Sequence, residues 1–456
     1  PFITASSVSA GVDLMPLIFS RSLRVQSFQL NDPHVTLRRS ASGTWNFSSL
    51  GASSSKSDSS SAAAISVLVR ALHITGGRIV VENARREQPR TYEDVGLEAT
   101  NLSYTTPFPF RITGKTPGTG TVAIEGHAGP FNLGNAAATP FQATADLKQL
   151  DITATGFADP ASGLRGVLDF TGGLTSDGAR MSTKGSVRAR NVQLLPGAAA
   201  ARVPVTIDYE STYDPKTQRG TVKQGDVHIG DAVARLTGNY DASGKNTTLD
   251  MTLRGAKMPV TQLQEALPAV GVTLPLGATL KEGTLDTELT IDGSVDALVI
   301  AGPVALSKGL LAGFDLGGKL GALASFAGLR TNQDTPIDRL SANLRVALER
   351  IQVDALDMVV PTIGTLTGAG AIMPTGAMDF AMLARVKEGL LSGGVARAAS
   401  FAQTSGIPFH VRGTTSNPTF TPDIGSAVKS GVVEAAKNPE NLKKAGDFIG
   451  GLFRRR

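Results

Sequence analysis

Cysteine is absent from the 456-residue chain, which excludes disulfide-stapled scaffolds and metal sites built on thiolates. Aromatic residues make up only 5% of the sequence, so large rings are too few to fill a thick core. No apolar run reaches the 18 residues that a membrane-spanning helix needs. The chain starts at Pro1 without methionine or a signal peptide, and we expect any anchor or export signal to lie upstream of it.

Clustered charge is also lacking. The formal net charge of +5 would suit an anionic lipid or a nucleic acid. The basic residues are scattered, however, and Trp45 with five tyrosines offers few rings on which bases would stack. We therefore expect no nucleic-acid partner.

Catalytic and metal-binding constellations are missing as well. The glycines of GTGTVA, from Gly118 to Ala123, are spaced like a dinucleotide-binding loop, but they precede an expected strand instead of opening a helix. Two Ser-x-x-Lys pairs, at Ser53 and Ser426, lack the partner motifs of the enzymes that use them. The histidines stand alone in strand-like sequence. The sequence predicts a protein without enzymatic activity, cofactor or metal.

Glycine is abundant, with 51 residues, and so is short apolar–polar alternation. From about Val122 to Leu383, one strand-like segment follows another with turn residues at each break. The clearest hairpin is LTGNYDASGKNTTLDMTLRG, in which Asp241 to Gly244 supply the turn. These units recur without a fixed period, which excludes a propeller or β-helix of regular repeats. We predict a mainly β fold, a long antiparallel meander.

A few stretches have helical rather than strand periodicity. The stretch Thr261–Val270 is expected to be a short helix that ends at Pro268. We predict short or amphipathic helices at Ile65–Leu72, Thr261–Val270, Leu306–Leu329, Val386–Gly406 and in the tail from Ser426. We also expect His73–Asn83 to be a hairpin turn that leads into a strand.

Composition divides the chain into four segments. The first has two expected strands, Val25–Leu30 and Val35–Leu37, and the second is rich in serine and alanine. The segments are an N-terminal unit (1–50), a flexible linker (51–64), an extended β region (65–425) and a basic amphipathic tail (426–456).

The β region ends in Ile407–Asp423. Phe409 and Val411 share one face of an expected last strand. Pro418 and Pro422 bracket a further extended piece, and because proline cannot donate to a sheet ladder, we expect this piece to be an edge.

Both ends of the chain resemble the AsmA family of Gram-negative-type envelope proteins. The C-terminal stretch is similar to the family's "IPF-x-x-x-GT-x-x-x-P-x-F-x-PD" ending. The N-terminal stretch fits the family pattern at Pro16, Leu17, Ile18, Pro33, Val35, Leu37, Arg38, Gly43 and Asn46. The resemblance rests on sequence motifs at the two ends of the chain. The middle is similar only in its general succession of strand-like segments.

The resemblance implies a long β-sheet that curls into an open hydrophobic groove with a few amphipathic helices. It further implies a non-enzymatic protein that binds phospholipids and transfers them toward the outer membrane, supporting outer-membrane assembly. Its location would be periplasmic, with an inner-membrane anchor upstream of Pro1. Its partners would be phospholipids and possible envelope proteins.

Alternation predicts which side chains line such a groove, on the assumption that the apolar face is concave. The predicted lipid-lining residues are Leu249, Met251, Leu253, Leu285, Leu289, Ile291, Leu344, Val346 and Leu348. We expect aspartate at Leu344 or Val346 to leave the sheet folded, because a groove wall is not tightly packed. The tail predicts contact with an anionic membrane through Lys443, Lys444, Phe448, Ile449, Phe453, Arg454, Arg455 and Arg456, or else a frayed terminus.

A second function class stays open on the sequence alone. A half-apolar sheet is covered by helices, by another sheet or by a ligand, and predicted helices are too scarce to cover this one. A structural or adhesive envelope protein, built as a closed β-sandwich array without lipid, has the same alternation. Co-purified phospholipid would separate the two.

Overall fold

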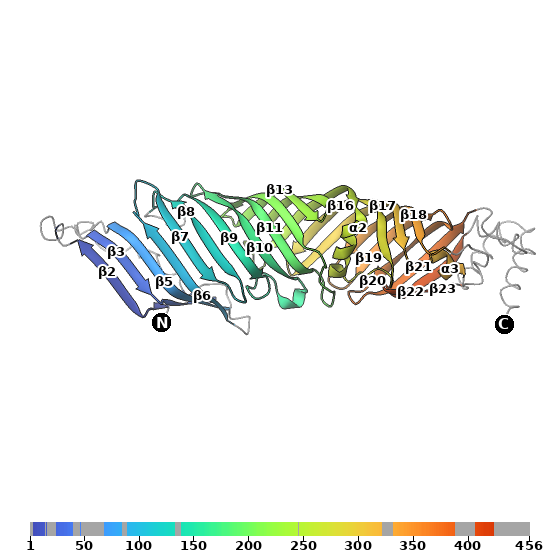
Figure 1. The fold of residues 1–456 in the computed structure, drawn as a ribbon, viewed down its shortest axis with the longest axis horizontal. Coiled ribbons are helices and arrows are strands. Elements are labelled where there is room, and N and C mark those ends of the chain that lie inside the picture. Colours follow the sequence, from blue (N-terminus) through green and yellow to red (C-terminus); the bar gives the residue numbers. More distant parts are fainter. Residues whose placement is uncertain are drawn as a thin grey trace, which may run out of the picture.

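The computed structural model describes residues 3–13, 15, 24–39, 46, 68–83, 89–132, 138–244, 246–321, 332–387 and 406–423. The described part is mainly β, with 67% of its residues in strands and 6% in helices. The 23 strands of the described part form one sheet, which makes an elongated, curled body with the N-terminal and C-terminal strands at opposite ends (Figure 1). The prediction of a mainly β, curled antiparallel sheet is confirmed.

Most strands are long, and they are joined by short connections. The strands are β1 (Ile3–Thr4), β2 (Ser7–Asp13), β3 (Arg24–Asn31), β4 (His34–Arg39), β5 (Leu68–Asn83), β6 (Arg90–Thr100), β7 (Phe108–Lys115), β8 (Thr121–Ala128), β9 (Phe141–Asp151), β10 (Arg165–Ser176), β11 (Met181–Gln193), β12 (Val205–Asp214), β13 (Arg219–Ile229), β14 (Ala232–Asp241), β15 (Thr248–Pro259), β16 (Thr279–Ser294), β17 (Ala297–Ala312), β18 (Thr335–Val346), β19 (Ile351–Val360), β20 (Gly364–Ile372), β21 (Ala377–Val386), β22 (Ile407–Thr414) and β23 (Asn417–Pro422). The helices are η2 (Pro160–Ser162), α2 (Val260–Leu263), η3 (Gln264–Val270) and α3 (Leu316–Gly321).

From β5 to β23, each strand pairs antiparallel with the next one in the chain. The start is different, because β3 and β4 both lie parallel to the 16-residue β5, one after the other along its length. Strand β2 then pairs with β3, and β1 with β4. The strands of residues 1–50 therefore belong to the same sheet as the rest.

Asn46 extends the hydrogen bonding of β4. Its main-chain N–H donates to the carbonyl oxygen of Arg38 at 2.9 Å, and its Oδ1 accepts from the Arg38 N–H at 2.9 Å. Its Nδ2 donates to the carbonyl oxygen of Thr36 at 2.7 Å. One side chain thus satisfies main-chain groups that a further strand would otherwise have to pair.

Two of the predicted helices are strand in part or in all of their described residues. Residues 68–72 begin β5, and Leu306–Ala312 ends β17, while α3 is helical within the predicted Leu306–Leu329. The expected turn in His73–Asn83 is also wrong, because Gly76, at φ +65°, lies inside β5. The reason lies in β-bulges: the register shifts at Gly77 and near Lys308, where φ is +54°. An extra residue changes the spacing of buried positions from two to three, which mimics a helical pattern.

The other helical predictions have mixed outcomes. Thr261–Val270 is helical as α2 followed by η3, but Pro268 lies inside η3, so the predicted end is two residues early. Val260 and Ala269 of these helices are buried, and α2 packs beside β16 while η3 contacts β11. The linker, most of Val386–Gly406 and the tail lie outside the described residues.

Bulges with a left-handed residue recur along the sheet and are satisfied by aspartates on the next strand. At Gln149, φ is +53° and the N–H donates to Asp169 Oδ1 at 2.8 Å. At Lys257, φ is +51° and the N–H donates to Asp286 Oδ1 at 2.9 Å. Because each bulge bends its strand and increases the local twist, these aspartates help to curl the sheet.

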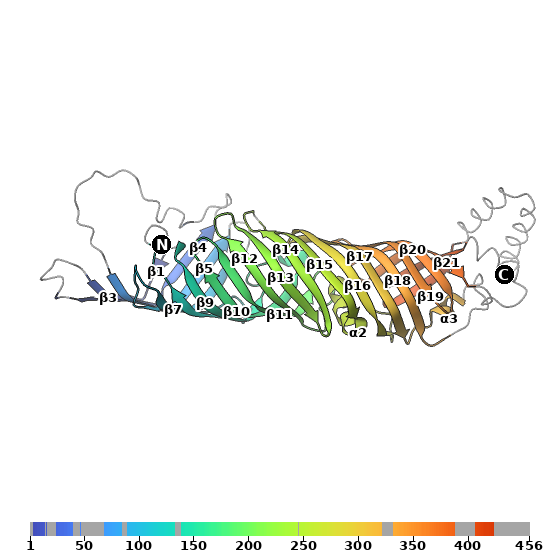
Figure 2. The same ribbon diagram turned by 90° about the horizontal axis from the view of Figure 1, so that it is seen from above.

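The curl brings opposite ends of distant strands together. The connection after β9 meets the connection after β16, where the Asp159 N–H donates to Asp296 Oδ1 at 2.8 Å. The connection after β15 meets the β22–β23 turn, where the Leu276 N–H donates to the Ser416 carbonyl oxygen at 2.8 Å. Both contacts join connections seven strands apart. These hydrogen bonds show that the two rims of the curled sheet touch at these points, whereas no strand pairing in the described part closes the sheet. Figures 1 and 2 show the elongated, curled sheet from two sides.

Candidate functional site

One face of the sheet is apolar across most of its length, and we call it the inner face because its side chains are the less exposed ones. Along a row of paired positions, nearly every residue is aliphatic or glycine. The row, from β2 to β15, is Val8, Leu30, Ile74, Leu97, Ile112, Ile124, Ala145, Gly172, Gly185, Tyr209, Gly225, Leu236 and Leu253. Most of these side chains are half-buried, so no second layer of the described protein covers them fully.

The opposite, outer face carries cross-strand ion pairs. Arg111 lies opposite Glu125 on β8, with its Nη2 2.5 Å from Glu125 Oε2. Similar pairs join β15 to β16 and β21 to β22, with Arg254 2.7 Å from Glu288. All these side chains are exposed, so solvent screens each pair and it contributes little to stability. The regular placement of these ion pairs identifies the outer face as the solvent-exposed one.

Glycines on the inner face lie beside large side chains. A Cβ at Gly172 would meet the Lys184 carbonyl oxygen at 2.6 Å and the Phe170 ring at 2.9 Å. A Cβ at Gly220 would meet the ring of Tyr240 at 2.1 Å. Side chains crowd one another on a concave surface, so alternating glycine with rings relieves the crowding. This accounts for glycine at these two inner positions.

The register brings several predicted lining residues together. Met251 of β15 lies opposite Ile291 of β16, and Leu253 lies opposite Leu289. Leu249 lies on the same face, two residues before Met251. Leu285 packs against two small buried clusters, one of which contains Met258. These residues share the inner face, as alternation predicts, and their contact with lipid stays a prediction.

The last three predicted positions have a different setting. Leu344 and Val346 pack against a large buried cluster at the C-terminal end of the sheet. Its largest fully buried side chains are Phe409, Leu320, Ile363, Leu366 and Val360. Leu348 is in the β18–β19 turn, not on a strand.

The C-terminal inner face is therefore filled by protein, partly by Leu316 and Leu320 of α3. Aspartate at Leu344 or Val346 would be placed against a packed core. Our expectation that these substitutions leave the sheet folded is corrected accordingly.

Sequence reasoning overlooked the inner face of the early strands. Ile112 and Ile124 lie directly opposite each other on β7 and β8, and both are half-buried. The burial of both strands alternates residue by residue. The same alternation is visible in FPFRITGK and GTVAIEGHAG, so this signal was available in the sequence.

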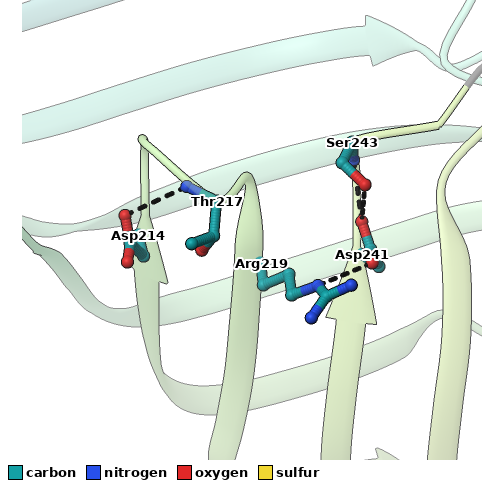
Figure 3. A network of polar contacts seen from close by, with 5 residues as sticks. All are labelled: Asp214, Thr217, Arg219, Asp241 and Ser243. Atoms are coloured by element: carbon teal, nitrogen blue, oxygen red, sulfur yellow. Dashed lines mark hydrogen bonds and ion pairs between the residues drawn. The ribbon is translucent and has the colours of Figure 1, made fainter.

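A cavity of about 680 Å³ lies at the ends of β12 to β15, and polar side chains of the outer face, such as Arg219, Thr221 and Asp241, contribute to its lining. Asp241 accepts hydrogen bonds from the Ser243 hydroxyl at 2.5 Å and N–H at 2.8 Å, and from Arg219 Nε at 2.8 Å (Figure 3). The Ser243 hydroxyl, the Ser243 N–H and Arg219, in that order, lower the pKa of Asp241 to about 2.

The neighbouring turn holds a second carboxylate in the same way. Asp214 accepts from the N–H groups of Lys216 at 2.8 Å and Thr217 at 3.3 Å, and these bonds lower the pKa of Asp214 (Figure 3). Both carboxylates are consequently ionised at neutral pH. No sequence signal pointed to this cavity, because four strands and their turns contribute to it.

Other candidate chemistry is limited within the described residues. They contain no group of three or more His, Cys, Asp or Glu side chains arranged to hold a metal. The helices of this part are all too short or too polar for a membrane span. The predicted membrane-contact residues of the tail, from Lys443 to Arg456, lie outside the described residues.

Comparison with models of known protein families, with curated proteins and with solved structures finds no significant match for this chain.

Proposed function

We propose that the curled sheet is a non-enzymatic phospholipid carrier, in which acyl chains lie against the inner face. The observation that carries this proposal is the apolar row from Leu30 to Leu253, in which most side chains are half-buried and lack a full second layer in the described part. A surface of this kind, hollowed by curling and lined by aliphatic side chains, is suited to long hydrocarbon chains.

The free-energy cost that an apolar path would remove is large. Two acyl chains contain about 30 CH₂ groups together, and each costs about 0.8 kcal/mol in water, so that crossing water costs roughly 25 kcal/mol. A continuous apolar face removes most of this cost at every step. An interruption by a charged side chain would restore part of it.

The AsmA-like ends of the chain support an envelope setting for this carrier. The proposal then includes a periplasmic location, an anchor in the inner membrane upstream of Pro1, and transfer toward the outer membrane. The tail would contribute membrane contact through its basic and apolar side chains. Each Lys or Arg close to an anionic surface contributes about 1 kcal/mol.

The closed-sandwich alternative is favoured only at one end. The cluster around Phe409 and Leu320 is a packed core, and acyl chains have no room among these side chains. We therefore propose that the lipid path runs from β2 toward β16 and ends before this cluster. Lipid would leave or enter sideways at that point.

A pair of adjacent residues tests the proposal. Ile112→Asp places a charge on the inner face, whereas Thr113→Asp places the same charge on the exposed outer face of the same strand. Charges facing lipid cost about 2–4 kcal/mol for Lys or Arg and less for Asp. We expect Ile112→Asp to reduce co-purified phospholipid roughly 5- to 30-fold, the equivalent of about 1–2 kcal/mol, and Thr113→Asp to leave it unchanged.

The readout is phospholipid quantified in an organic extract, with a circular-dichroism melt of both variants. An unfolded Ile112→Asp variant beside a stable Thr113→Asp variant would support a packed sandwich. A folded Ile112→Asp variant with unchanged lipid, or a wild-type protein without any phospholipid, would remove the inner face from lipid binding.

A further inference from the structure

Three connections meet where the two rims of the sheet touch in its C-terminal half. We call them the rim turns, and they are residues 271–278 between η3 and β16, residues 373–376 between β20 and β21, and residues 415–416 between β22 and β23. The Leu276 N–H donates to the Ser416 carbonyl oxygen at 2.8 Å. The Thr415 N–H donates to the Gly376 carbonyl oxygen at 2.9 Å. Hydrogen bonds therefore join the three turns into one surface.

The rim turns expose apolar side chains. Leu276 is 91% exposed, more than any other large apolar residue of the described part, and Met373 is 45% exposed. A Cβ at the adjacent Gly277 would have no neighbouring atom within 4 Å, so the turn stands clear of its surroundings. Single exposed apolar residues are common on protein surfaces, and a site needs further evidence.

The composition of the rim turns provides such evidence, because charge is absent from them. None of their residues is Lys, Arg, His, Asp or Glu. The turn after β10, by contrast, contains Asp177 and Arg180, and the turn after β18 contains Glu349 and Arg350. A partner that binds through ion pairs would find no charge in the rim turns. Entry into an apolar medium is favoured there, because no charged group has to leave water.

Main-chain N–H groups are the next cost of leaving water. The Thr273 N–H donates to Thr415 Oγ1 at 3.2 Å, and the Ala278 N–H donates to the Pro275 carbonyl oxygen at 2.8 Å. Pro275 itself has no N–H, and the Leu276 N–H is bonded to the β22–β23 turn. Much of the turn that carries Leu276 thus has its N–H groups satisfied within the protein.

The packed core holds this turn in place. Val272 and Ala278, on either side of Leu276, pack against the buried cluster around Phe409. A side chain on an anchored turn loses little conformational freedom when it binds, so more of the free energy of its burial contributes to binding.

We propose that the rim turns dock on the surface of a phospholipid bilayer, with Leu276 inserted among the acyl chains and Met373 beside it. This contact goes beyond the acyl-chain path on the inner face and does not depend on it. It also differs from the contact proposed for the tail, because attraction between charges contributes nothing to it. Docking is therefore expected on lipid without net charge and at high salt.

Vesicle flotation with the full chain tests this docking. Phosphatidylcholine vesicles in about 0.5 M salt suppress the electrostatic contribution of the tail. Leu276→Ser should weaken partitioning into the vesicles about tenfold, and Met373→Ser about threefold, because each removes apolar area buried in the bilayer. Val233→Ser should not change it. Val233 is the matched control, since it is 44% exposed on the outer face of β14.

The absence of cysteine permits a second readout. An environment-sensitive dye attached at Leu276→Cys should shift its emission to shorter wavelength when vesicles are added, and the same dye at Val233→Cys should not. Because Leu276 is exposed, its variants should melt like the wild type.

Wild-type protein that does not float with the vesicles would overturn the docking surface, and so would Leu276→Ser protein that floats as well as the wild type. A protein dimer that Leu276→Ser dissociates, without a dye shift on vesicles, would also overturn it and assign the rim turns to contact between two copies of the chain.

Discussion

Gly172 and Gly173 are adjacent in β10, yet their surroundings differ by face. A Cβ at Gly172 would come within 2.6 Å of a backbone oxygen and 2.9 Å of the Phe170 ring, whereas at Gly173 the nearest atom is 4.0 Å away. The inner face at this point has no room even for a methyl group. Glycine there is a consequence of curvature.

This difference predicts opposite effects for the same substitution. Gly172→Ala should destabilise the protein by about 1–3 kcal/mol, because the methyl group overpacks the inner face. Gly173→Ala should be neutral or stabilise by about 0.4–1 kcal/mol, because it reduces the entropy of the unfolded chain. Denaturant unfolding of both variants measures the difference, and equal effects would contradict the assignment of faces.

A further prediction concerns the pKa of Asp241. Its pKa of about 2 depends on the Ser243 hydroxyl, the Ser243 N–H and Arg219, in that order. We expect Ser243→Ala and Arg219→Gln each to raise the pKa of Asp241 toward its ordinary value, because each removes one of these partners. Carboxyl NMR titration of the wild type and both variants measures this pKa, and a value unchanged in both variants would contradict the account.

The sign of the stability effect follows from the lowered pKa. The ionised Asp241 contributes to stability fully above the unfolded pKa near 3.9, and this contribution is lost as the pH falls toward about 2. The free energy of unfolding should therefore fall less between about pH 4 and pH 2 in Ser243→Ala than in the wild type.

At the scale of single residues, the sequence predicted which side chains share a face of the sheet. Alternation alone places Leu249, Met251 and Leu253 on one side, and the register agrees. It failed for Leu348, because nothing in NLRVALERIQVDAL marks the turn that begins after Val346.

Among the elements, the bulges decide both the shape and the errors of prediction. A left-handed residue such as Lys308 keeps the inner positions inward while it adds one residue to the strand. The resulting spacing resembles that of a helix, so Leu306–Ala312 was predicted to be helical. Propensity does not reveal bulges, since non-glycine residues such as Gln149 and Lys257 occupy them under tertiary constraint.

The rim contact at Asp296 is a testable element of the curl. Asp296→Ala removes the acceptor for the Asp159 N–H, a bond worth about 0.5–1.5 kcal/mol, and should loosen the connection after β9. Hydrogen exchange should then increase in residues 152–164 and not in the neighbouring strands. Asp292→Ala, on the exposed outer face of β16, is the matched control. Equal exchange in the wild type and Asp296→Ala would show that this rim bond does not hold the curl.

For the whole molecule, the sheet combines an open apolar face with a packed end. The early strands leave the inner face half-buried, and the C-terminal strands fill it around Phe409. The sequence predicted one antiparallel sheet and its last edge strand, β23, with Pro418 and Pro422. It did not predict where the face is filled, because that depends on contacts between segments far apart in the chain, such as Leu276 with Ser416.

The cavity at the ends of β12 to β15 was not predicted either. Its lining comes from four successive strands and their turns, and it depends on the register that places Asp214, Arg219 and Asp241 side by side. Alternation within one strand does not reveal this register.

The acyl-chain path is tested most directly by photo-crosslinking in cells. A photoreactive phenylalanine analogue is placed at Ile112 and Leu253 on the inner face, and at their neighbours Thr113 and Arg254 on the outer face. The carrier proposal predicts phospholipid adducts, identified by mass spectrometry, at the two inner positions and none at the two outer ones. Adducts of equal yield on both faces, or none at Ile112 and Leu253 in a folded protein, would contradict it.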